Sequence, residues 1–355
     1  MPGSRKDRRW PGGVLLMLAA IAAPATASVA DDAGPGMRVV ALDALSPLSA
    51  RDEITRRLLS PLGLRAYQRE VAKKRLLVAD QTIAAGAEHY DLFVPAAPPG
   101  GRYGLLVFVS PAGGFVPPQG WTEVLSREGL VMVSARASGN DQDMLERRVP
   151  LALNGYGYAI RHFPIDPERV YIAGFSGGGR TAQLVGVAYP DVFRGILTFS
   201  GSDPFGETAV APPPRELMSL VQARTRIVQS TGTADEVNIA IDGRTRRSMA
   251  ALCVANVAHA DEPRLGHGLP RGSGLSRALK ALQAQPRGDP GDAACEAALQ
   301  ARIERGLAVI AASIDAGRIV PARKALLALD AHYGWLAAPG SVRAMERIET
   351  VSGTR

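Results

Sequence analysis

The feature that most constrains this chain is a run that changes character around one serine. Residues 170–173 are β-branched, aromatic and apolar, a Gly-x-Ser-x-Gly pentapeptide centred on Ser176 follows, and residues 180–188 are compatible with a helix. A strand that meets a helix at so short a turn strains the central residue, and it leaves space only for small residues two positions before and after it. The run therefore predicts a tight strand-to-helix corner with Ser176 at its tip and Gly174 and Gly178 beside it.

Strand-like and helix-like segments alternate from residue 82 onward. The expected strands lie at 89–94, 105–109, 130–133, 170–173, 195–199, 225–229 and 254–258, and the expected helices at 121–128, 151–162, 180–188 and 244–252. Such alternation is typical of a mostly parallel sheet with helices on both faces. Ligands of these sheets bind at the carboxyl ends of the strands, which is where Ser176 would lie.

The two ends of the chain have a different texture. Residues 31–48 are punctuated by Gly and Pro and predict an extended arm, and residues 49–78 have a helical pattern. After Gly274 the chain is rich in alanine and leucine, with expected helices at 275–285, 293–314, 321–333 and 342–348 and a linker at 286–291. We therefore divide the chain into a signal peptide (1–27), an N-terminal arm with helices (28–80), an α/β domain (81–275) and a C-terminal helical extension (276–355). The extension is expected to pack on the sheet or to contact another protein, and a degenerate pair of helical repeats is the alternative.

The first residues have the pattern of an export signal. A basic start precedes an apolar core at 14–23, and small residues at 25–27 or 28–30 suit cleavage. The core is too short to span a bilayer comfortably, so we expect no stable membrane span after cleavage and a protein that is periplasmic or secreted. An uncleaved anchor is the alternative. The net charge is +7, of which the first 27 residues supply +3, and no basic cluster interleaved with aromatics is present, which argues against nucleic-acid binding.

Cysteine usage agrees with export. The chain has two cysteines, Cys253 and Cys295, and a pair in an exported protein predicts a disulfide. Closing a loop of this length would stabilise the fold by up to about 4 kcal/mol in the chain-entropy model. Two separate buried thiols are the alternative. The closed loop would contain His267.

A serine hydroxyl becomes a good nucleophile when a base accepts its proton and a carboxylate orients that base. Asp235 comes directly beyond the expected strand at 225–229, so its carboxylate should reach the carboxyl edge of the sheet. It could alternatively cap the helix that follows it. Asp203, beyond the preceding strand, is the competing acid.

The base must be a histidine that follows the serine and reaches the same edge. His267 lies in the glycine-flanked segment 265–270, which would let an imidazole approach its neighbours closely, and it is the preferred candidate. His259 could instead close the last strand, and His332 belongs to the helical extension. The nearby group of His259, Asp261, Glu262 and His267 matches no zinc-ligand spacing, so no metal site is expected.

An oxyanion formed during acyl transfer needs two N–H donors. One should be Gly177, directly after the serine, and the second should come from the loop after the expected strand at 105–109, in the sequence Ser110-Pro111-Ala112-Gly113-Gly114-Phe115. Pro111 has no N–H, which leaves Ala112 or Gly113. The alternative is that this loop is only a flexible connection.

Together these segments resemble the α/β-hydrolase superfamily, and within it the secreted esterases that include polyhydroxybutyrate depolymerase-like, feruloyl and acetylxylan esterases. The resemblance extends over about residues 82–272, and the matching segments are 89–95, 165–179, 189–193 and 266–268. It implies a nucleophile elbow at Ser176, a triad of Ser176, Asp235 and His267, and no cofactor. Such esterases usually carry a His-Gly pair where this chain has Ser110-Pro111, so the oxyanion loop is expected to differ in shape.

The sequence therefore predicts an exported serine hydrolase that cleaves small or polymeric carboxylic esters through an acyl-enzyme. Two alternatives stay open at this point. One is a serine peptidase of the prolyl-oligopeptidase type, which shares the Gly-x-Ser-x-Gly-Gly sequence, and the other is a non-catalytic binding or scaffold protein on a hydrolase fold.

Overall fold

A computed structural model describes residues 35–73, 83–96, 100–207, 211–284 and 292–353, so the predicted signal peptide at 1–27 lies outside the described residues. The strands are β1 (Gly36–Ala41), β2 (His89–Val94), β3 (Tyr103–Val109), β4 (Leu130–Ala135), β5 (Ile165–Phe175), β6 (Gly195–Phe199), β7 (Arg226–Ser230) and β8 (Val257–His259). The α-helices are α1 (Arg51–Leu58), α2 (Pro61–Ala72), α3 (Trp121–Glu128), α4 (Val149–His162), α5 (Gly177–Ala188), α6 (Arg215–Ala223), α7 (Glu236–Ala251), α8 (Gly272–Gln283), α9 (Ala293–Asp315), α10 (Ile319–Tyr333) and α11 (Gly340–Val351). Short helical turns occur at η1 (Pro47–Ser49), η2 (Met144–Arg148) and η3 (Gly334–Ala337).

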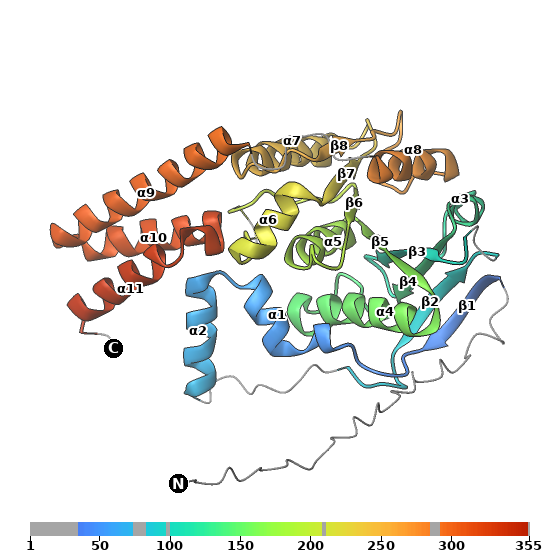
Figure 1. The fold of residues 1–355 in the computed structure, drawn as a ribbon, viewed down its shortest axis with the longest axis horizontal. Helices are drawn as coiled ribbons and strands as arrows, with labels where there is room; N and C mark the ends of the chain where they lie inside the picture. Colours follow the sequence, from blue (N-terminus) through green and yellow to red (C-terminus); the bar gives the residue numbers. More distant parts are fainter. Residues whose placement is uncertain (1–34, 74–82, 97–99, 208–210, 285–291, 354–355) are drawn as a thin grey trace, which may run out of the picture.

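One eight-stranded sheet organises the described chain (Figure 1). Its strand order is β1-β2-β4-β3-β5-β6-β7-β8; β1 and β4 each pair antiparallel with β2, and every pair from β4 to β8 is parallel. The carboxyl ends of β3 to β8 therefore meet at one edge. The predicted mostly parallel sheet is confirmed, and β5, which leads to Ser176, is central in it.

Alternating side chains of the parallel strands fill a separate core on each face of the sheet. In β3, Leu106 and Phe108 belong to one core, and Leu105 and Val107 belong to the other. The first core is covered by α3 and α8, which contribute Trp121 and Leu275, and the second is covered by α4, α5 and α6. Because a strand alternates sides with each residue, a continuous apolar run such as β3 can be buried on both faces.

The structure refines two of the predicted segments and moves one predicted boundary. The arm expected at 31–48 contains β1, an edge strand whose alternating burial suits one face on the sheet and one in water. The helical pattern expected at 49–78 is present over its described part as α1 and α2, which are separate because Leu59 is extended and the hydroxyl of Ser60 caps α2 by accepting from the N–H of Gly63. The domain boundary at residue 275 falls inside α8, whose apolar side chains pack on the sheet beside α3, so this helix does not belong to the C-terminal extension.

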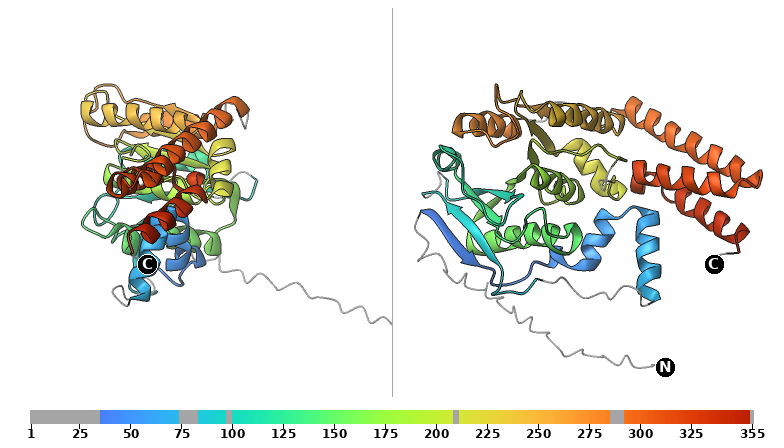
Figure 2. Two further views of the ribbon diagram at one scale, coloured as in Figure 1. Left: turned by 90° about the vertical axis from the view of Figure 1, so that its left-hand side faces the viewer. Right: turned by 180° about the vertical axis from the view of Figure 1, so that it is seen from behind.

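The C-terminal helices α9, α10 and α11 lie at one end of the molecule, beside α2 and away from β1 to β4 (Figures 1 and 2). Glu349 of α11 forms ion pairs with Arg65 and Arg69 of α2. The buried Asp330 of α10 accepts the N–H of Leu62 at the start of α2, and the indole of Trp335 donates to the carbonyl of Leu59 at 2.9 Å. The extension thus packs on the N-terminal helices, a contact that sequence reasoning did not predict.

A disulfide links this helical end to the α/β part. Cys253 follows α7, Cys295 lies in the first turn of α9, and their sulfurs are bonded, with a Cα–Cα distance of 5.9 Å. None of the helices within the described ranges has the length and apolar character needed to cross a membrane.

Candidate active site

Ser176 occupies the corner between β5 and α5 in a strained backbone conformation, with φ 52° and ψ −122°. A Cβ on Gly174 would lie 2.2 Å from the carbonyl oxygen of Gly178, and one on Gly178 would lie 2.0 Å from that of Val109. Both positions therefore exclude any side chain. The N–H of Ser176 donates to the carbonyl of Phe199 on β6 at 2.9 Å, which holds the corner against the neighbouring strand.

The loops that follow β7 and β8 are joined by their backbones. The N–H of Thr233 donates to the carbonyl of Glu262, and that of Ala234 donates to the carbonyl of Leu265, both at 2.9 Å. A Cβ on Gly232 would lie 2.1 Å from the carbonyl oxygen of Leu265, so the two loops touch at a glycine. Asp235 on the first loop and His267 on the second are consequently held at a fixed separation.

These elements bring the three predicted residues into one hydrogen-bonded chain. The Nε2 of His267 lies 3.0 Å from the Oγ of Ser176, and its Nδ1 lies 2.7 Å from the Oδ2 of Asp235. The Asp235 side chain is 7% exposed, while that of His267 is 46% exposed. The imidazole can therefore reach both the serine hydroxyl and a substrate arriving from solvent, with a buried carboxylate behind it.

Asp235 also caps α7, the alternative role that its sequence position allowed. Its carboxylate accepts from the N–H of Asn238 at 3.4 Å and from the side-chain Nδ2 of Asn238 at 2.9 and 3.0 Å. Burial alone would raise the pKa of this carboxyl, but the hydrogen bonds from His267 and Asn238 outweigh it and hold the pKa below its ordinary value. The carboxylate is thus kept ionised beside the imidazole.

Asn238 and Phe175 are site residues that sequence reasoning missed. Asn238 is three residues after Asp235, the spacing at which a side chain in the first helical turn returns to the cap, and that spacing could have found it. The ring of Phe175 packs on the imidazole of His267, with centroids 4.9 Å apart. Phe175 is the second residue of the Gly-x-Ser-x-Gly pentapeptide, but only the tertiary fold places it against His267.

The competing candidates lie elsewhere. Asp203 forms an ion pair with Arg180, with 3.2 Å between Oδ1 and Nε, and burial raises its pKa although Arg180 opposes this shift. His259 ends β8 with its ring mostly exposed and 3.2 Å from Asp261. His332 lies on α10, against Gly206. Within the described residues no group of His, Cys, Asp and Glu side chains is arranged to hold a metal ion.

The loop after β3 is closed by Ser110, which stands where the resembling esterases have histidine. Its hydroxyl donates to the carbonyl of Gly114 at 2.9 Å and accepts the N–H of Ala112 at 3.1 Å. Ala112 is therefore withdrawn as an oxyanion donor, because its N–H is already bonded within the loop. The N–H groups of Gly113 and Gly177 have no acceptor among the described residues.

The far end of this loop is fixed by Asp91 of β2. Its carboxylate accepts the N–H of Phe115 at 2.8 Å, and its other oxygen lies 3.5 Å from the Nε of Arg136. The aromatic ring of Phe115 is buried against Phe108 and Trp121. The alternative prediction was that this loop is only a flexible connection. Hydrogen bonds instead hold it at both ends.

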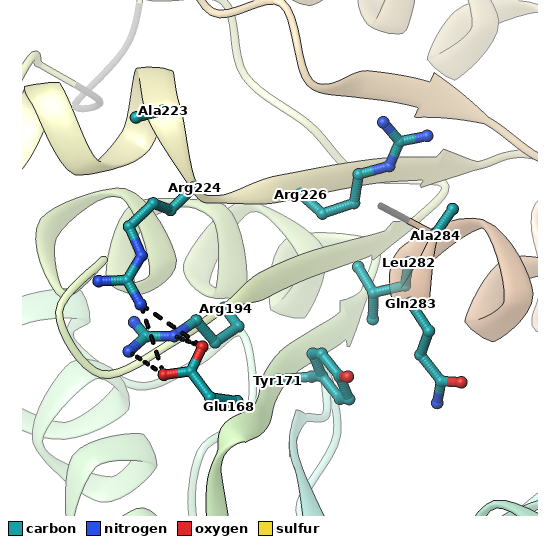
Figure 3. A pocket seen from close by; sticks show the side chains of 9 residues that line it. All are labelled: Glu168, Tyr171, Arg194, Ala223, Arg224, Arg226, Leu282, Gln283 and Ala284. Atoms are coloured by element: carbon teal, nitrogen blue, oxygen red, sulfur yellow. Dashed lines mark hydrogen bonds and ion pairs between the residues drawn. The ribbon is translucent and has the colours of Figure 1, made fainter. Parts of the chain in front are cut away.

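A cavity of about 310 Å³ lies at the opposite edge of the sheet, at the amino ends of β5, β6 and β7 (Figure 3). Glu168 accepts two hydrogen bonds from Arg194, at 2.9 and 3.0 Å, and lies 3.4 Å from Arg224. The hydrogen bond from Arg194 lowers the pKa of Glu168. These residues tie the starts of three strands together, and they lie away from Ser176, which stands at the carboxyl end of β5.

Comparison with known proteins agrees with this architecture. The family model described as "Esterase PHB depolymerase" matches residues 157–262, which include Ser176 and Asp235 and end five residues before His267. The chain has the α/β-hydrolase fold. The match also confirms the resemblance to polyhydroxybutyrate depolymerase-like esterases, and it supports a carboxylic ester hydrolase.

Several solved hydrolases are similar at low identity. A puromycin-hydrolyzing peptidase of Mycobacterium tuberculosis is 16% identical with a TM-score of 0.43, over 72% of this chain and 40% of that one. A thermostable esterase is 16% identical with a TM-score of 0.40, over 57% and 60%. A ferulic acid esterase is 14% identical with a TM-score of 0.44, over 70% and 97%. The chain thus spans less than two thirds of the length of the first two. No curated protein matches it in sequence.

Proposed function

We propose that this α/β-hydrolase is an exported serine esterase that cleaves carboxylic esters through an acyl-enzyme. The observation that carries the proposal is the continuous hydrogen-bonded chain from the Oγ of Ser176 through the imidazole of His267 to the carboxylate of Asp235. A serine hydroxyl that solvent can partly reach, a base in contact with it and a carboxylate behind the base are the parts that acyl transfer requires.

In the first half-reaction the Oγ of Ser176 attacks the ester carbonyl carbon while its proton passes to the Nε2 of His267. The carbonyl electron pair moves onto oxygen, which accepts hydrogen bonds from the N–H groups of Gly177 and Gly113. The tetrahedral intermediate then collapses, and the departing alkoxide takes the proton from His267. The lowered pKa of Asp235 keeps this carboxylate negative beside the imidazolium, which stabilises the charge formed during the proton transfer.

In the second half-reaction a water molecule replaces the alcohol. His267 accepts its proton as the oxygen attacks the acyl carbon, and the second tetrahedral intermediate collapses to the free acid and the Ser176 hydroxyl, which regains its proton from His267. No cofactor takes part in these steps. The large exposed fraction of the His267 side chain gives the water direct access.

The test is the Ser176→Ala variant with a short-chain p-nitrophenyl ester as substrate. We expect turnover to fall by at least about 10⁴-fold, because removing the nucleophile of such a triad has that effect. The circular dichroism spectrum and melting temperature should stay close to those of the native protein. A fluorophosphonate probe should label native protein stoichiometrically at Ser176 and leave the variant unlabelled.

The same experiment separates the alternatives. Retained turnover in Ser176→Ala would overturn the proposal. Cleavage of peptide amides in preference to esters would instead identify a peptidase, and folded native protein that neither reacts with the probe nor hydrolyses esters would identify a binding or scaffold protein.

Export is the second part of the proposal. It is supported by the signal-like sequence at 1–27 and by the disulfide between Cys253 and Cys295, since such bonds persist in oxidising compartments. Protein recovered from the periplasm or medium should begin at Ser28 or Asp31 by intact mass. A mature chain that retains Met1 would contradict cleavage. A contact between the C-terminal helices and another protein stays a prediction.

A further inference from the structure

One side chain outside the triad lies directly against the elbow. Asn140 belongs to the loop after β4, and a Cβ on Gly177 would lie 2.1 Å from its Oδ1, 2.8 Å from its Cγ and 3.0 Å from its Nδ2. The carboxamide therefore packs on the Cα of Gly177, the residue whose N–H is the first proposed oxyanion donor.

The backbone of Asn140 is held against the oxyanion loop. Its N–H donates to the carbonyl of Pro111 at 2.9 Å, and a Cβ on the preceding Gly139 would lie 3.4 Å from the carbonyl carbon of Ala112. The loop after β4 is also closed on itself, because the N–H of Gln142 donates to the carbonyl of Gly139 at 3.0 Å. Three loops, those after β3, β4 and β5, thus meet around the space beside Gly177.

The carboxamide itself is not engaged in holding this structure together. Asn140 is exposed, and no hydrogen bond joins its side chain to any of the described residues. Other amides near the site behave differently, since both carboxylate oxygens of Asp235 accept from Asn238. Because nothing fixes the amide plane of Asn140, rotation about its last bond can direct Nδ2 toward the substrate.

We propose that Asn140 is a catalytic residue whose Nδ2 donates a third hydrogen bond to the oxyanion, beside the N–H groups of Gly113 and Gly177. The inference rests on the proposed esterase function. The withdrawal of Ala112, whose N–H is bonded to Ser110, leaves the loop after β3 with fewer backbone donors than its sequence offered. A side-chain amide is a chemically suitable addition, since asparagine serves as an oxyanion donor in other hydrolases.

Asn140 itself transfers no proton in this step, since the proton of the Ser176 hydroxyl passes to the Nε2 of His267. As Oγ of Ser176 bonds to the carbonyl carbon, the π electron pair moves to oxygen, and the Nδ2–H bond of Asn140 points at the negative charge that results. The hydrogen bond strengthens as the charge develops, so it should lower the barrier more than it improves substrate binding.

The test compares Asn140→Ala and the isosteric Asn140→Asp with native protein on a short-chain p-nitrophenyl ester. We expect kcat to fall by about 10²- to 10³-fold in Asn140→Ala, the effect of losing one such donor, with KM changed less than about threefold. Asn140→Asp should fall further, because a carboxylate would repel the oxyanion. Affinity for an alkyl boronic acid, which imitates the tetrahedral intermediate, should fall in proportion to kcat/KM.

Gln142→Ala is the matched control. Gln142 is a polar residue of the same loop whose side chain donates to Asp141, and its removal should leave kcat within about twofold. If Asn140→Ala melts early, Asn140→Asp preserves the volume and carries the comparison. Native protein that hydrolyses the ester while Asn140→Ala and Asn140→Asp retain kcat overturns this inference alone, whereas native protein that does not react with fluorophosphonate overturns the esterase proposal beneath it.

Discussion

The fold buries two carboxylates that have similar surroundings and opposite pKa shifts. Asp235 lies at the carboxyl edge of the sheet, and Asp330 lies at the junction of α10 with α2. Each accepts a backbone N–H near the start of a helix, and their exposed fractions are 7% and 2%. Asp235 also faces an imidazole, and its pKa is lowered. Asp330 faces the N–H of Leu62 and the hydroxyl of Ser60, and burial raises its pKa despite these hydrogen bonds.

The difference shows what makes a buried carboxylate useful for chemistry. At Asp330 the hydrogen bonds from Ser60 and Leu62 do not outweigh burial, whereas at Asp235 the hydrogen bonds from His267 and Asn238 do. His267 can become positively charged and is half-exposed, so the pair can form and lose a charge while substrate is bound. The first region is therefore suited to proton transfer, and the second to joining helices.

The largest expected effect on kcat in this comparison comes from removing the negative charge of Asp235. Asp235→Asn retains a residue that caps helices well, so α7 should remain folded. It cannot stabilise the imidazolium of His267, and we expect kcat for a p-nitrophenyl ester to fall by about 10³- to 10⁴-fold. Steady-state kinetics measure this loss, and melting temperature checks the fold.

The control for that variant is Asp203→Asn, which alters the competing acid. It should change kcat by less than about threefold, because Asp203 pairs with Arg180 and not with His267. A larger loss in Asp203→Asn than in Asp235→Asn would exchange their assigned roles.

The next largest effect concerns the disulfide that joins the end of α7 to α9. Replacing both Cys253 and Cys295 by serine opens a loop with a sequence separation of 42 residues, and we expect the free energy of unfolding to fall by about 4 kcal/mol. Urea denaturation measures the change. Ester turnover at 25 °C should stay within about threefold, since neither cysteine contacts the triad. Dithiothreitol should destabilise native protein and leave the double variant unaffected; equal sensitivity of both would show that the bond contributes nothing.

A smaller effect is expected at the docking of α11 on α2. Burial alone would raise the pKa of Glu349, but Arg69 and Arg65 lower it, so its contribution to stability is present above the ordinary glutamate pKa of 4.5 and is lost as pH falls through the lowered value. Glu349→Gln should reduce the free energy of unfolding at pH 7 by about 1 kcal/mol, because both arginines are partly exposed to solvent. In urea titrations the difference from native protein should vanish at acidic pH, and a difference independent of pH would contradict the assignment.

The smallest effect is expected at Asp330, where the pH dependence of stability should have the opposite sign to that at Glu349. Because the folded pKa of Asp330 is raised, its contribution to stability is complete below the ordinary aspartate pKa of 3.8 and is lost as pH rises through the raised value. Asp330→Asn keeps an acceptor for the N–H of Leu62 and removes the buried charge. The variant should be at least as stable as native protein at pH 7, with that advantage shrinking toward pH 4 and with unchanged kcat. Marked destabilisation at pH 7 would show that the ionised form is needed.

The sequence was informative wherever local pattern and chemistry coincide. Trp121–Glu128, Gly195–Phe199 and His89–Val94 were predicted with the bounds that the structure has, since each is bordered by glycine or proline or by a change of period. Gly174 and Gly178 pointed to the corner at Ser176 because no other residue fits there. The order of serine, acid and histidine along later strand ends then led to Asp235 and His267.

Other features depend on contacts between distant segments. β1 was missed because an edge strand has a weak pattern and needs β2 beside it to become visible. The assignment of α8 to the sheet depends on Trp121 and the strands that it covers, and the packing of α10 and α11 on α2 joins positions more than 260 residues apart. No local signal reports such pairs.

The sequence by itself determined the strained serine, the alternation that builds the sheet, and the residue types able to serve as acid and base. Only the tertiary structure decided which carboxylate faces the imidazole, that Ser110 withdraws the N–H of Ala112, and that Asn140 lies over Gly177. The physical reason is range: backbone strain and burial patterns act over a few residues, whereas a hydrogen bond at 3 Å between loops requires the whole sheet to fix where each strand ends.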